Sequence, residues 1–269
     1  MSAVASVEGP ITPAPHLRLW AERLEQHDRT VTVAPRGHLK STLLYAYLAW
    51  RLSRMEQRSI RALYFSAKRE LAQEHLRLCK DYIEALDLPG LEPLSDAESI
   101  LRFRKDNYVF ECVPEGILAA SRGRHVDILL LDDVLVDPAS PLKLDLIANV
   151  TRIFQRKLVP MLKGAATVIH VIGTPLAEND LLSYLKENAE FDYAEYPAIM
   201  EDSQPLWPEH YTLEMLERIR STIGAAAFDI EYQLKPAVQG VSYLDPALVT
   251  AAIYDPAQRS KDEDYLCRS

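Results

Sequence analysis

A strand of four consecutive apolar residues, Ile128–Leu131, ends in Asp132 and Asp133, and this segment constrains the fold more than any other. Uninterrupted apolar strands are typical of parallel sheets that are buried on both faces. A second strand of this kind is expected at Thr167–Ile172. Because helical patterns alternate with such strands, the sequence predicts an α/β fold with a mostly parallel sheet covered by helices on both faces.

The other elements follow from hydrophobic periodicity and from turn residues. Helices are expected at residues 16–26, 40–54, 69–86, 141–158, 180–187 and 211–232, the last with a break near Gly224. Strands are expected at residues 30–33, 61–65, 126–131 and 193–196, and a β-hairpin at 101–113.

Length and composition fit a globular protein with a sizeable core. The chain has 269 residues, of which 48% are apolar and 26% charged, enough for one large α/β domain with a small appendage. The net charge of −9 argues against a protein that coats nucleic acid over its whole surface. Cys79, Cys112 and Cys267 lack metal-ligand spacing, and neither a secretory signal nor a membrane-spanning stretch is visible.

The segment Ala34–Thr42 follows an expected strand and opens an expected helix, which is the context of a phosphate-binding loop of the Walker A type. Backbone N–H groups at a helix N-terminus bind phosphate through unpaired donors and the helix dipole. In such loops a lysine reaches the β- and γ-phosphates, and the next hydroxyl binds Mg²⁺. Lys40 and Ser41 occupy those two places.

This loop departs from the usual pattern at two positions. Glycine normally stands at both ends of the first six positions, where this chain has Ala34 and Leu39. Leu39 is therefore expected to adopt the backbone conformation that glycine normally supplies. The alternative interpretation is an ordinary strand–helix turn with Lys40 as a surface lysine.

The paired aspartates stand at the carboxyl end of their strand, the edge at which open α/β folds bind ligands. We expect Asp132 to hold Mg²⁺ through its water, and Asp133 to orient or deprotonate the attacking water. Many ATPases have glutamate in the second place, and aspartate is one methylene shorter. The alternative is that both acids cap the turn or helix that follows.

A third segment, Ile172–Pro175, ends the neighbouring buried strand in Gly-Thr-Pro. Thr174 at the strand tip can sense the γ-phosphate and pass its loss to the next loop. The alternative is an ordinary turn at the end of a strand.

Arginines are expected near the γ-phosphate, because phosphoryl transfer spreads negative charge over its oxygens. Arg122 and Arg124 lie in an exposed loop before the aspartate strand and could reach the nucleotide of a neighbouring subunit. Arg36, inside the phosphate loop, could act within its own subunit. Which arginine acts in trans is left open.

Together these motifs resemble the ATPase domain of the large terminase subunit, the DNA-packaging motor of tailed bacteriophages. The resemblance lies in the arginine-bearing loop Ala34–Thr42, in Arg122–His125 before Leu129–Asp133, in Ile172–Pro175, and in Phe228–Gln233 with Pro236. It spans roughly residues 16 to 260.

The resemblance implies a RecA-like (ASCE) P-loop ATPase and ATP-driven translocation of double-stranded DNA into a procapsid. By position, ATP would contact Pro35, Arg36, Gly37, His38, Leu39, Lys40, Ser41, Thr42 and Thr174. Mg²⁺ would bind at Ser41 and Asp132, with Asp133 as the catalytic carboxylate and Arg122 or Arg124 as the trans-acting finger. His16 and Trp20 are candidates for adenine contacts, with Trp20 also expected in the core.

The domain boundaries expected from the same resemblance divide the chain into four parts. They are a disordered N-terminus (1–15), the ATPase core (16–200), a small C-terminal lid or linker subdomain (201–240) and the start of a truncated nuclease domain (241–269). Nuclease sites of this kind need three or more carboxylates. Asp255, Asp262 and Asp264 are expected to be tail carboxylates without a metal, so we expect no nuclease activity from this chain.

The implied partners are double-stranded DNA, the phage portal and procapsid, the small terminase subunit and further copies of the chain. The ring is expected to be a pentamer on the portal, and the chain a monomer in solution. It would work in the cytoplasm of the infected host, without a membrane. Two other functions share the motifs. One is an ATP-binding assembly module with little turnover, and the other is a helicase or other RecA-like motor, for which no second RecA-like domain is found.

Overall fold

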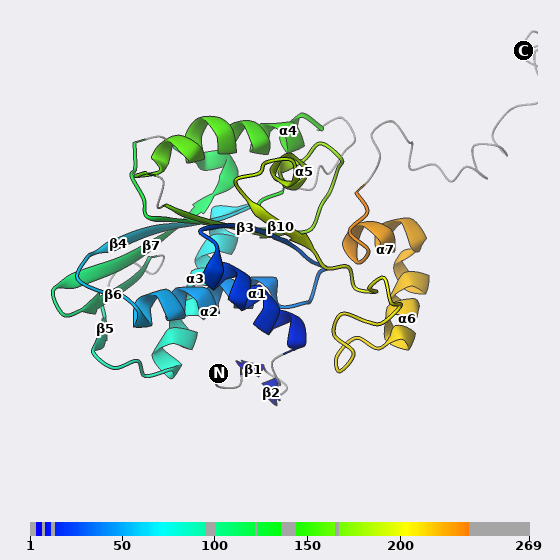
Figure 1. Ribbon diagram of the computed structural model, residues 1–269, viewed down its shortest axis with the longest axis horizontal. Coiled ribbons are helices and arrows are strands. Elements are labelled where there is room, and N and C mark those ends of the chain that lie inside the picture. Colours follow the sequence, from blue (N-terminus) through cyan, green and yellow to red (C-terminus); the bar gives the residue numbers. More distant parts are fainter. Residues whose placement is uncertain are drawn as a thin grey trace, which may run out of the picture. The chain divides into compact units, whose positions relative to one another are not determined.

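The centre of the computed structural model is a sheet that joins eight of the described strands in the order β10-β3-β9-β8-β4-β7-β6-β5 (Figure 1). The structure describes residues 4–6, 9–11, 14–94, 100–121, 123–135, 144–164 and 167–236. The strands are β3 (Arg29–Val33), β4 (Ile60–Ser66), β5 (Leu91–Pro93), β6 (Leu101–Lys105), β7 (Tyr108–Gly116), β8 (Ile128–Asp132), β9 (Val168–Gly173) and β10 (Asp192–Glu195).

All strand pairs from β10 to β7 run parallel, and only the β7-β6 and β6-β5 pairs are antiparallel. The mostly parallel sheet and the β-hairpin at 101–113 are thereby confirmed. The short edge strand β5 was not expected, because its three residues follow the Leu88-Pro89-Gly90 helix break and carry no period-2 pattern.

Helices cover both faces of the sheet, as predicted (Figure 1). One face carries α1 (Pro15–Gln26), α2 (Lys40–Ser53) and α3 (Arg69–Ala85), and the other carries α4 (Leu144–Ile153) and α5 (Leu181–Lys186). Each layer encloses its own apolar cluster. Trp20, Leu44 and Leu48 belong to the first cluster, and Val150 and Leu182 to the second.

The helix expected at residues 141–158 is not uniform. Its described part begins at Leu144 and changes after Ile153 to a π-helical turn, Phe154–Leu158, and then to a 3₁₀ turn, Val159–Met161. Pro160 lacks a backbone N–H and cannot continue an α-helix, which accounts for the end of the element.

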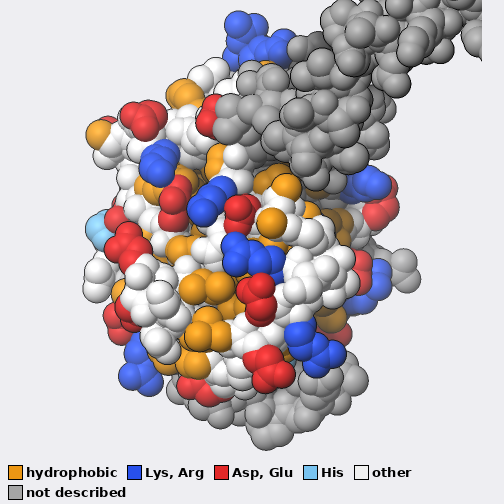
Figure 2. All heavy atoms as spheres, turned by 90° about the vertical axis from the view of Figure 1, so that its right-hand side faces the viewer, with side chains coloured by type: hydrophobic (Ala, Val, Ile, Leu, Met, Phe, Trp, Pro, Cys, Tyr) orange, Lys and Arg blue, Asp and Glu red, His pale blue; other side chains and the backbone are white. Residues whose placement is uncertain are grey.

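Two short helices, α6 (Leu213–Ile223) and α7 (Ala225–Glu231), follow the sheet. Gly224 between them has φ 85°, a left-handed value that favours glycine, and this confirms the expected break. The α6 helix buries Leu216 and leaves Leu213, Met215 and Ile223 exposed. Figure 2 views this side of the molecule, where apolar side chains lie among charged ones.

A separate antiparallel pair, β1 (Val4–Ser6) and β2 (Gly9–Ile11), precedes the sheet. The described residues include no helix that is long and apolar enough to cross a membrane. Residues 237–269, with Asp255, Asp262 and Asp264, lie outside the described residues. The expected nuclease start and the other domain boundaries therefore stay predictions.

Candidate functional site

Three neighbouring strands bring the predicted site residues to one edge of the sheet. The β3 strand pairs with β9 as far as Gly173, and β9 pairs with β8 as far as Asp132. Just beyond the strands, the N–H of Ala34 donates to the Gly173 carbonyl and the N–H of Asp133 to the Ile172 carbonyl, each over 3.1 Å. The loop after β3, the tip of β9 and the paired aspartates therefore meet at the carboxyl edge, where ligands bind in open α/β folds.

The loop after β3, residues 34–39, leads directly into α2. Leu39 has φ 61° and ψ 29°, the left-handed conformation expected of it, which costs a residue with a side chain about 1–2 kcal/mol. No side chain caps the N-terminus of α2. Its first backbone N–H groups have no intrahelical acceptors, so this end of the helix can receive an anion.

Lys40, the first residue of α2, is buried against the loop and the tip of β9. Its Nζ donates to the carbonyl of Pro35 and to the hydroxyl of Thr174, each over 3.1 Å, and lies 3.7 Å from Oδ2 of Asp133. Thr174 in turn donates to the Ala34 carbonyl over 3.0 Å. Only 5% of Lys40 is exposed, so the interpretation of Lys40 as a surface lysine is wrong.

Asp132 is completely buried, and its two oxygens have different surroundings. Oδ2 accepts a hydrogen bond from the Tyr64 hydroxyl and lies 3.7 Å from Nε2 of His75. Oδ1 is buried without a hydrogen-bond partner. Burial, followed by the neighbouring Asp133, raises the pKa of Asp132, while His75, Tyr64 and the Ser41 hydroxyl oppose that rise.

These surroundings fit a magnesium ion. Mg²⁺ prefers hard oxygen ligands and is held in nucleotide sites by one or two carboxylates together with the phosphates. Asp132 offers the unpartnered Oδ1, and Ser41 on the first turn of α2 lies close enough to interact with the same carboxylate. A buried carboxylate oxygen without a donor is costly in the absence of a cation.

Asp133 faces the lysine instead of the core. Its φ is 44°, and about half of its side chain is exposed. Within the described residues, neither Asp132 nor Asp133 caps a helix. Asp133 is therefore the carboxylate that remains accessible from solvent at this edge.

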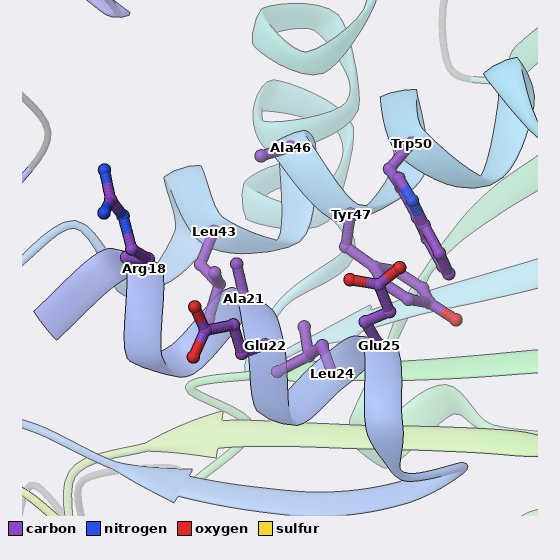
Figure 3. Close-up of a pocket in the computed structure, with 9 residues that line it drawn as sticks. All are labelled: Arg18, Ala21, Glu22, Leu24, Glu25, Leu43, Ala46, Tyr47 and Trp50. Carbon is purple, nitrogen blue, oxygen red and sulfur yellow. The ribbon is translucent and has the colours of Figure 1, made fainter. Parts of the chain in front are cut away.

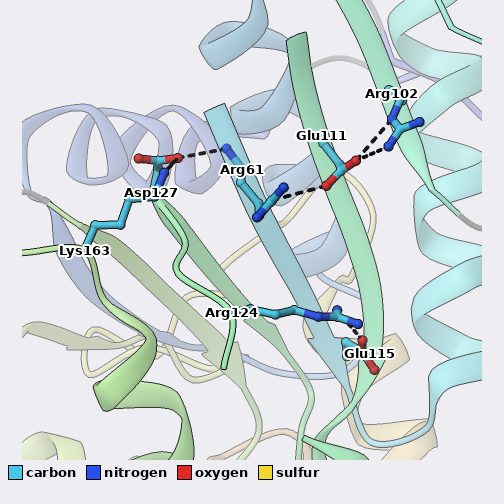
Figure 4. A network of polar contacts seen from close by, with 7 residues as sticks. All are labelled: Arg61, Arg102, Glu111, Glu115, Arg124, Asp127 and Lys163. Atoms are coloured by element: carbon cyan, nitrogen blue, oxygen red, sulfur yellow. Dashed lines mark hydrogen bonds and ion pairs between the residues drawn. The ribbon is translucent and has the colours of Figure 1, made fainter. Parts of the chain in front are cut away.

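The arginine candidates differ in what the structure says of them. Arg36, with its side chain 77% exposed, pairs through Nε with Oε2 of Glu231 on α7 over 3.2 Å. Arg124 donates to Oε1 of Glu115 over 2.6 Å (Figure 4). Arg122 lies outside the described residues. Within one subunit, the described candidates are thus held by carboxylates.

Aromatic residues from the segment before α6 lie against the loop. The ring of Tyr211 stacks on the ring of His38 with centroids 4.5 Å apart and an interplanar angle of 11°. Trp207 meets His38 edge-on at 6.3 Å. A Cβ placed on Gly37, whose φ is 78°, would lie 2.1 Å from the Tyr211 hydroxyl oxygen. Burial lowers the pKa of His38 to about 4, so its ring is neutral near pH 7.

The two adenine candidates have different positions. Nε2 of His16 approaches the His38 carbonyl at 3.4 Å, so His16 lies beside the loop. Trp20 is fully buried in the core, which agrees with the alternative role expected for it. An adenine contact by either residue stays a prediction.

Three residues at this site, Tyr64, His75 and Tyr211, were not predicted from the sequence. They lie on β4, on α3 and just before α6, and their spacing follows no known motif. The sequence around Tyr64 has the pattern of an ordinary strand, and the sequence around His75 has the pattern of an amphipathic helix. Only the pairing of β4 with β8 and the packing of α3 on the sheet bring both side chains to Asp132.

Comparison with solved structures yields matches to phage terminases. No protein-family model and no curated protein matches the sequence. The large terminase ATPase domain of Thermus phage P74-26 has a TM-score of 0.62 at 17% identity, covering 84% of this chain and 94% of that domain.

Two longer terminases also match. The large terminase of a thermophilic bacteriophage in complex with ADP has a TM-score of 0.60 at 9% identity over 83% of this chain, and that of bacteriophage HK97 has 0.59 at 13% over 87%. This chain covers 53% of each of them. It therefore spans about half the length of these two terminases. The chain has the RecA-like α/β fold of phage large terminase ATPase domains.

Proposed function

We propose that this chain hydrolyses ATP with Mg²⁺ and thereby drives double-stranded DNA into a viral procapsid. The single observation that carries the proposal is the meeting of Lys40, Thr174, Asp132 and Asp133 at one sheet edge. The likeness of the fold to terminase ATPase domains, including structures of a thermophilic phage terminase with ADP and with ATP-γ-S, supports it.

Lys40 would bind the β- and γ-phosphates, together with the backbone N–H groups of residues 36–42. In the present structure its ammonium is satisfied by two neutral oxygens and by Asp133. Phosphate oxygens would compete for the same donor. Asp133 would then lose part of its hold on Lys40 and become available to a water molecule.

Ser41 and Asp132 would hold Mg²⁺, which when bound neutralises charge on the phosphate oxygens. Asp133 would orient or deprotonate the attacking water. Thr174, bonded to both Lys40 and the Ala34 carbonyl, would report the loss of the γ-phosphate to the segment after β9.

Charge that develops on the γ-phosphate needs a cationic partner. Arg36 would supply it from the loop, or Arg122 or Arg124 from a neighbouring subunit in a ring. The proposed ring stands on a portal in the host cytoplasm, with DNA and the small terminase subunit as partners. The proposed lid comprises residues 201–240, and α7 meets the loop through the Glu231 carbonyl, which accepts from the N–H of Arg36 over 3.3 Å.

A translocation assay tests the motor function. An oligonucleotide is bound as a third strand on duplex DNA, and its ATP-dependent displacement is followed for the wild type, Lys40→Ala and Lys163→Ala. Lys163 is a matched control, because it is an exposed lysine paired with Asp127 at the opposite edge of the sheet. Displacement that needs Lys40 but not Lys163, without separation of the duplex strands, supports the proposal. Strand separation would favour a helicase. ATP binding with neither displacement nor turnover would favour an assembly module.

A further inference from the structure

Asp132 is backed by a chain of polar side chains from three other elements. The Tyr64 hydroxyl on β4 donates to Oδ2 of Asp132. His75 on α3 places Nε2 3.7 Å from the same oxygen. On its other side, Nδ1 of His75 meets the hydroxyl of Tyr45 on α2. Side chains from three consecutive elements, α2, β4 and α3, thus converge behind a carboxylate on β8.

The partners are unevenly divided between the two carboxylate oxygens. Tyr64 and His75 both lie on the side of Oδ2, whereas Oδ1 is buried and has no hydrogen-bond partner. An arrangement that served only to stabilise the fold would be expected to satisfy both oxygens, because a buried unpaired acceptor costs about 1–3 kcal/mol. The asymmetry fits a carboxylate that is fixed through one oxygen and keeps the other for a ligand.

The donor chain is consistent with one tautomer of His75. If Tyr45 donates to Nδ1, Nε2 carries the proton and turns it toward Asp132. At 3.7 Å the approach of Nε2 is longer than a hydrogen bond, so His75 acts through its dipole, and Tyr64 is the direct donor.

We propose that Tyr64 and His75, supported by Tyr45, are positioning residues that fix the Asp132 carboxylate so that Oδ1 binds the divalent cation of the nucleotide. The proposal rests on the proposed ATPase function. It names residues that act through Asp132 and touch neither nucleotide nor metal. Partners of this kind orient a metal ligand, and their removal typically lowers metal affinity about 10–100-fold.

The test measures metal binding directly. Mn²⁺, which takes the same oxygen ligands as Mg²⁺, is titrated into the protein with saturating ADP, and free Mn²⁺ is followed by electron paramagnetic resonance. Tyr64→Phe removes one oxygen and keeps the ring in the core. We expect the Kd for Mn²⁺ to rise about 10-fold or more in this variant and in His75→Gln, and less in Tyr45→Phe. The affinity for ADP in EDTA should stay within about two-fold.

Tyr47→Phe is the matched control. Like Tyr45, Tyr47 is a buried tyrosine on α2. Tyr47, however, lines a pocket of about 220 Å³ between α1 and α2, beside Trp50 and Leu24 (Figure 3). The Mn²⁺ affinity of the Tyr47→Phe variant should equal that of the wild type. Excess Mg²⁺ should restore ATP turnover in Tyr64→Phe, which a general loss of structure would not allow.

The outcomes separate the two proposals. If the wild type binds Mn²⁺ with ADP and both Tyr64→Phe and His75→Gln keep that affinity, the positioning role is wrong and the ATPase function stands. If the wild type shows no ADP-dependent Mn²⁺ site, both are contradicted. Should Tyr64→Phe fail to fold, as judged by thermal melting, His75→Gln and Tyr45→Phe decide the question alone.

Discussion

The ammonium of Lys40 donates to the hydroxyl of Thr174 over 3.1 Å, although the two residues are 134 positions apart. One belongs to the helix that follows β3 and the other to the tip of β9. The same threonine hydroxyl donates to the Ala34 carbonyl, so it bridges the loop and the lysine. Whatever displaces Lys40 from Thr174 therefore changes the contacts of β9 with the loop.

We expect Thr174→Val to lower ATP turnover about 10-fold or more, because a hydrogen bond to a charged group contributes about 1.5–3 kcal/mol. The shape of the side chain is kept, so the affinity for MgADP should change little. Thr174→Ser retains the hydroxyl and is the control. Equal turnover in Thr174→Val and the wild type would remove Thr174 from the mechanism.

Asp133→Asn should bind ATP normally and hydrolyse it about 10²–10⁴-fold more slowly, the range typical for loss of a general base. The amide keeps the size of the side chain but cannot accept a proton. Asp133→Glu, which restores the residue that many ATPases carry, should keep turnover. These rates come from single-turnover kinetics. A fully active Asp133→Asn would assign the base to another group.

If Arg124 is the trans-acting arginine, it must leave Glu115 to reach a neighbour's nucleotide. Arg124→Ala should then lose turnover while its nucleotide affinity stays within a few-fold, as should Arg122→Ala if that residue is the finger. Mixing Lys40→Ala with the inactive arginine variant should recover part of the activity, because a mixed ring contains sites with both groups intact. If both arginine variants keep full activity, or if mixing recovers nothing, the trans-acting role is wrong.

The stability of the fold should fall on acidification because of buried histidines. Burial, aided by Arg51 and Arg23, lowers the pKa of His170 from 6.5 to about 3. Between these values the unfolded chain binds a proton that the folded protein does not, so the free energy of unfolding decreases as pH falls below about 6.5. Per pH unit the loss approaches about 1.4 kcal/mol for one such group.

Urea unfolding between pH 7 and 4.5 measures this slope. Carboxylates titrate in the same range, so the wild type is compared with His170→Gln. Between pH 7 and 4.5 this variant should lose less of its free energy of unfolding than the wild type, by on the order of 2 kcal/mol. Identical losses would mean that His170 takes up a proton as readily in the folded protein as in the unfolded chain.

Gly37→Ala should destabilise the protein, because Cβ would lie 2.1 Å from the Tyr211 hydroxyl oxygen and φ is 78°. The double variant with Tyr211→Phe removes that oxygen, and the nearest ring atom is then 3.2 Å away. We expect it to be more stable than Gly37→Ala by about 1 kcal/mol, while the cost of the left-handed φ remains. Equal stabilities of these two variants in urea would show that Tyr211 does not lie against the loop.

The sequence predicted which residues meet at the carboxyl edge of the sheet, because parallel-strand geometry determines their places. Residues that follow buried parallel strands come together at one edge whatever the loops do, so Lys40, Asp132 and Thr174 could be grouped from their places after three strands. The left-handed Leu39 was predictable because the turn from β3 into α2 requires that conformation at a position where glycine is usual.

Contacts made by the sides of elements were not predictable in this way. Tyr64 and His75 reach Asp132 only because β4 pairs with β8 and α3 packs over β4 and β7. A tyrosine in a strand or a histidine on a helix usually has no such role. The stacking of Tyr211 on His38 depends on the path of the chain between β10 and α6, which no local pattern determines.

Whether the chain is an ATPase completed by a neighbouring subunit is decided most directly by ATP hydrolysis with Mg²⁺, measured against protein concentration. The wild type, Lys40→Ala and Lys163→Ala are compared. We expect a rate per subunit that rises with concentration, is lost in Lys40→Ala and is unchanged in Lys163→Ala. Hydrolysis by Lys40→Ala at the wild-type rate would contradict the proposed function.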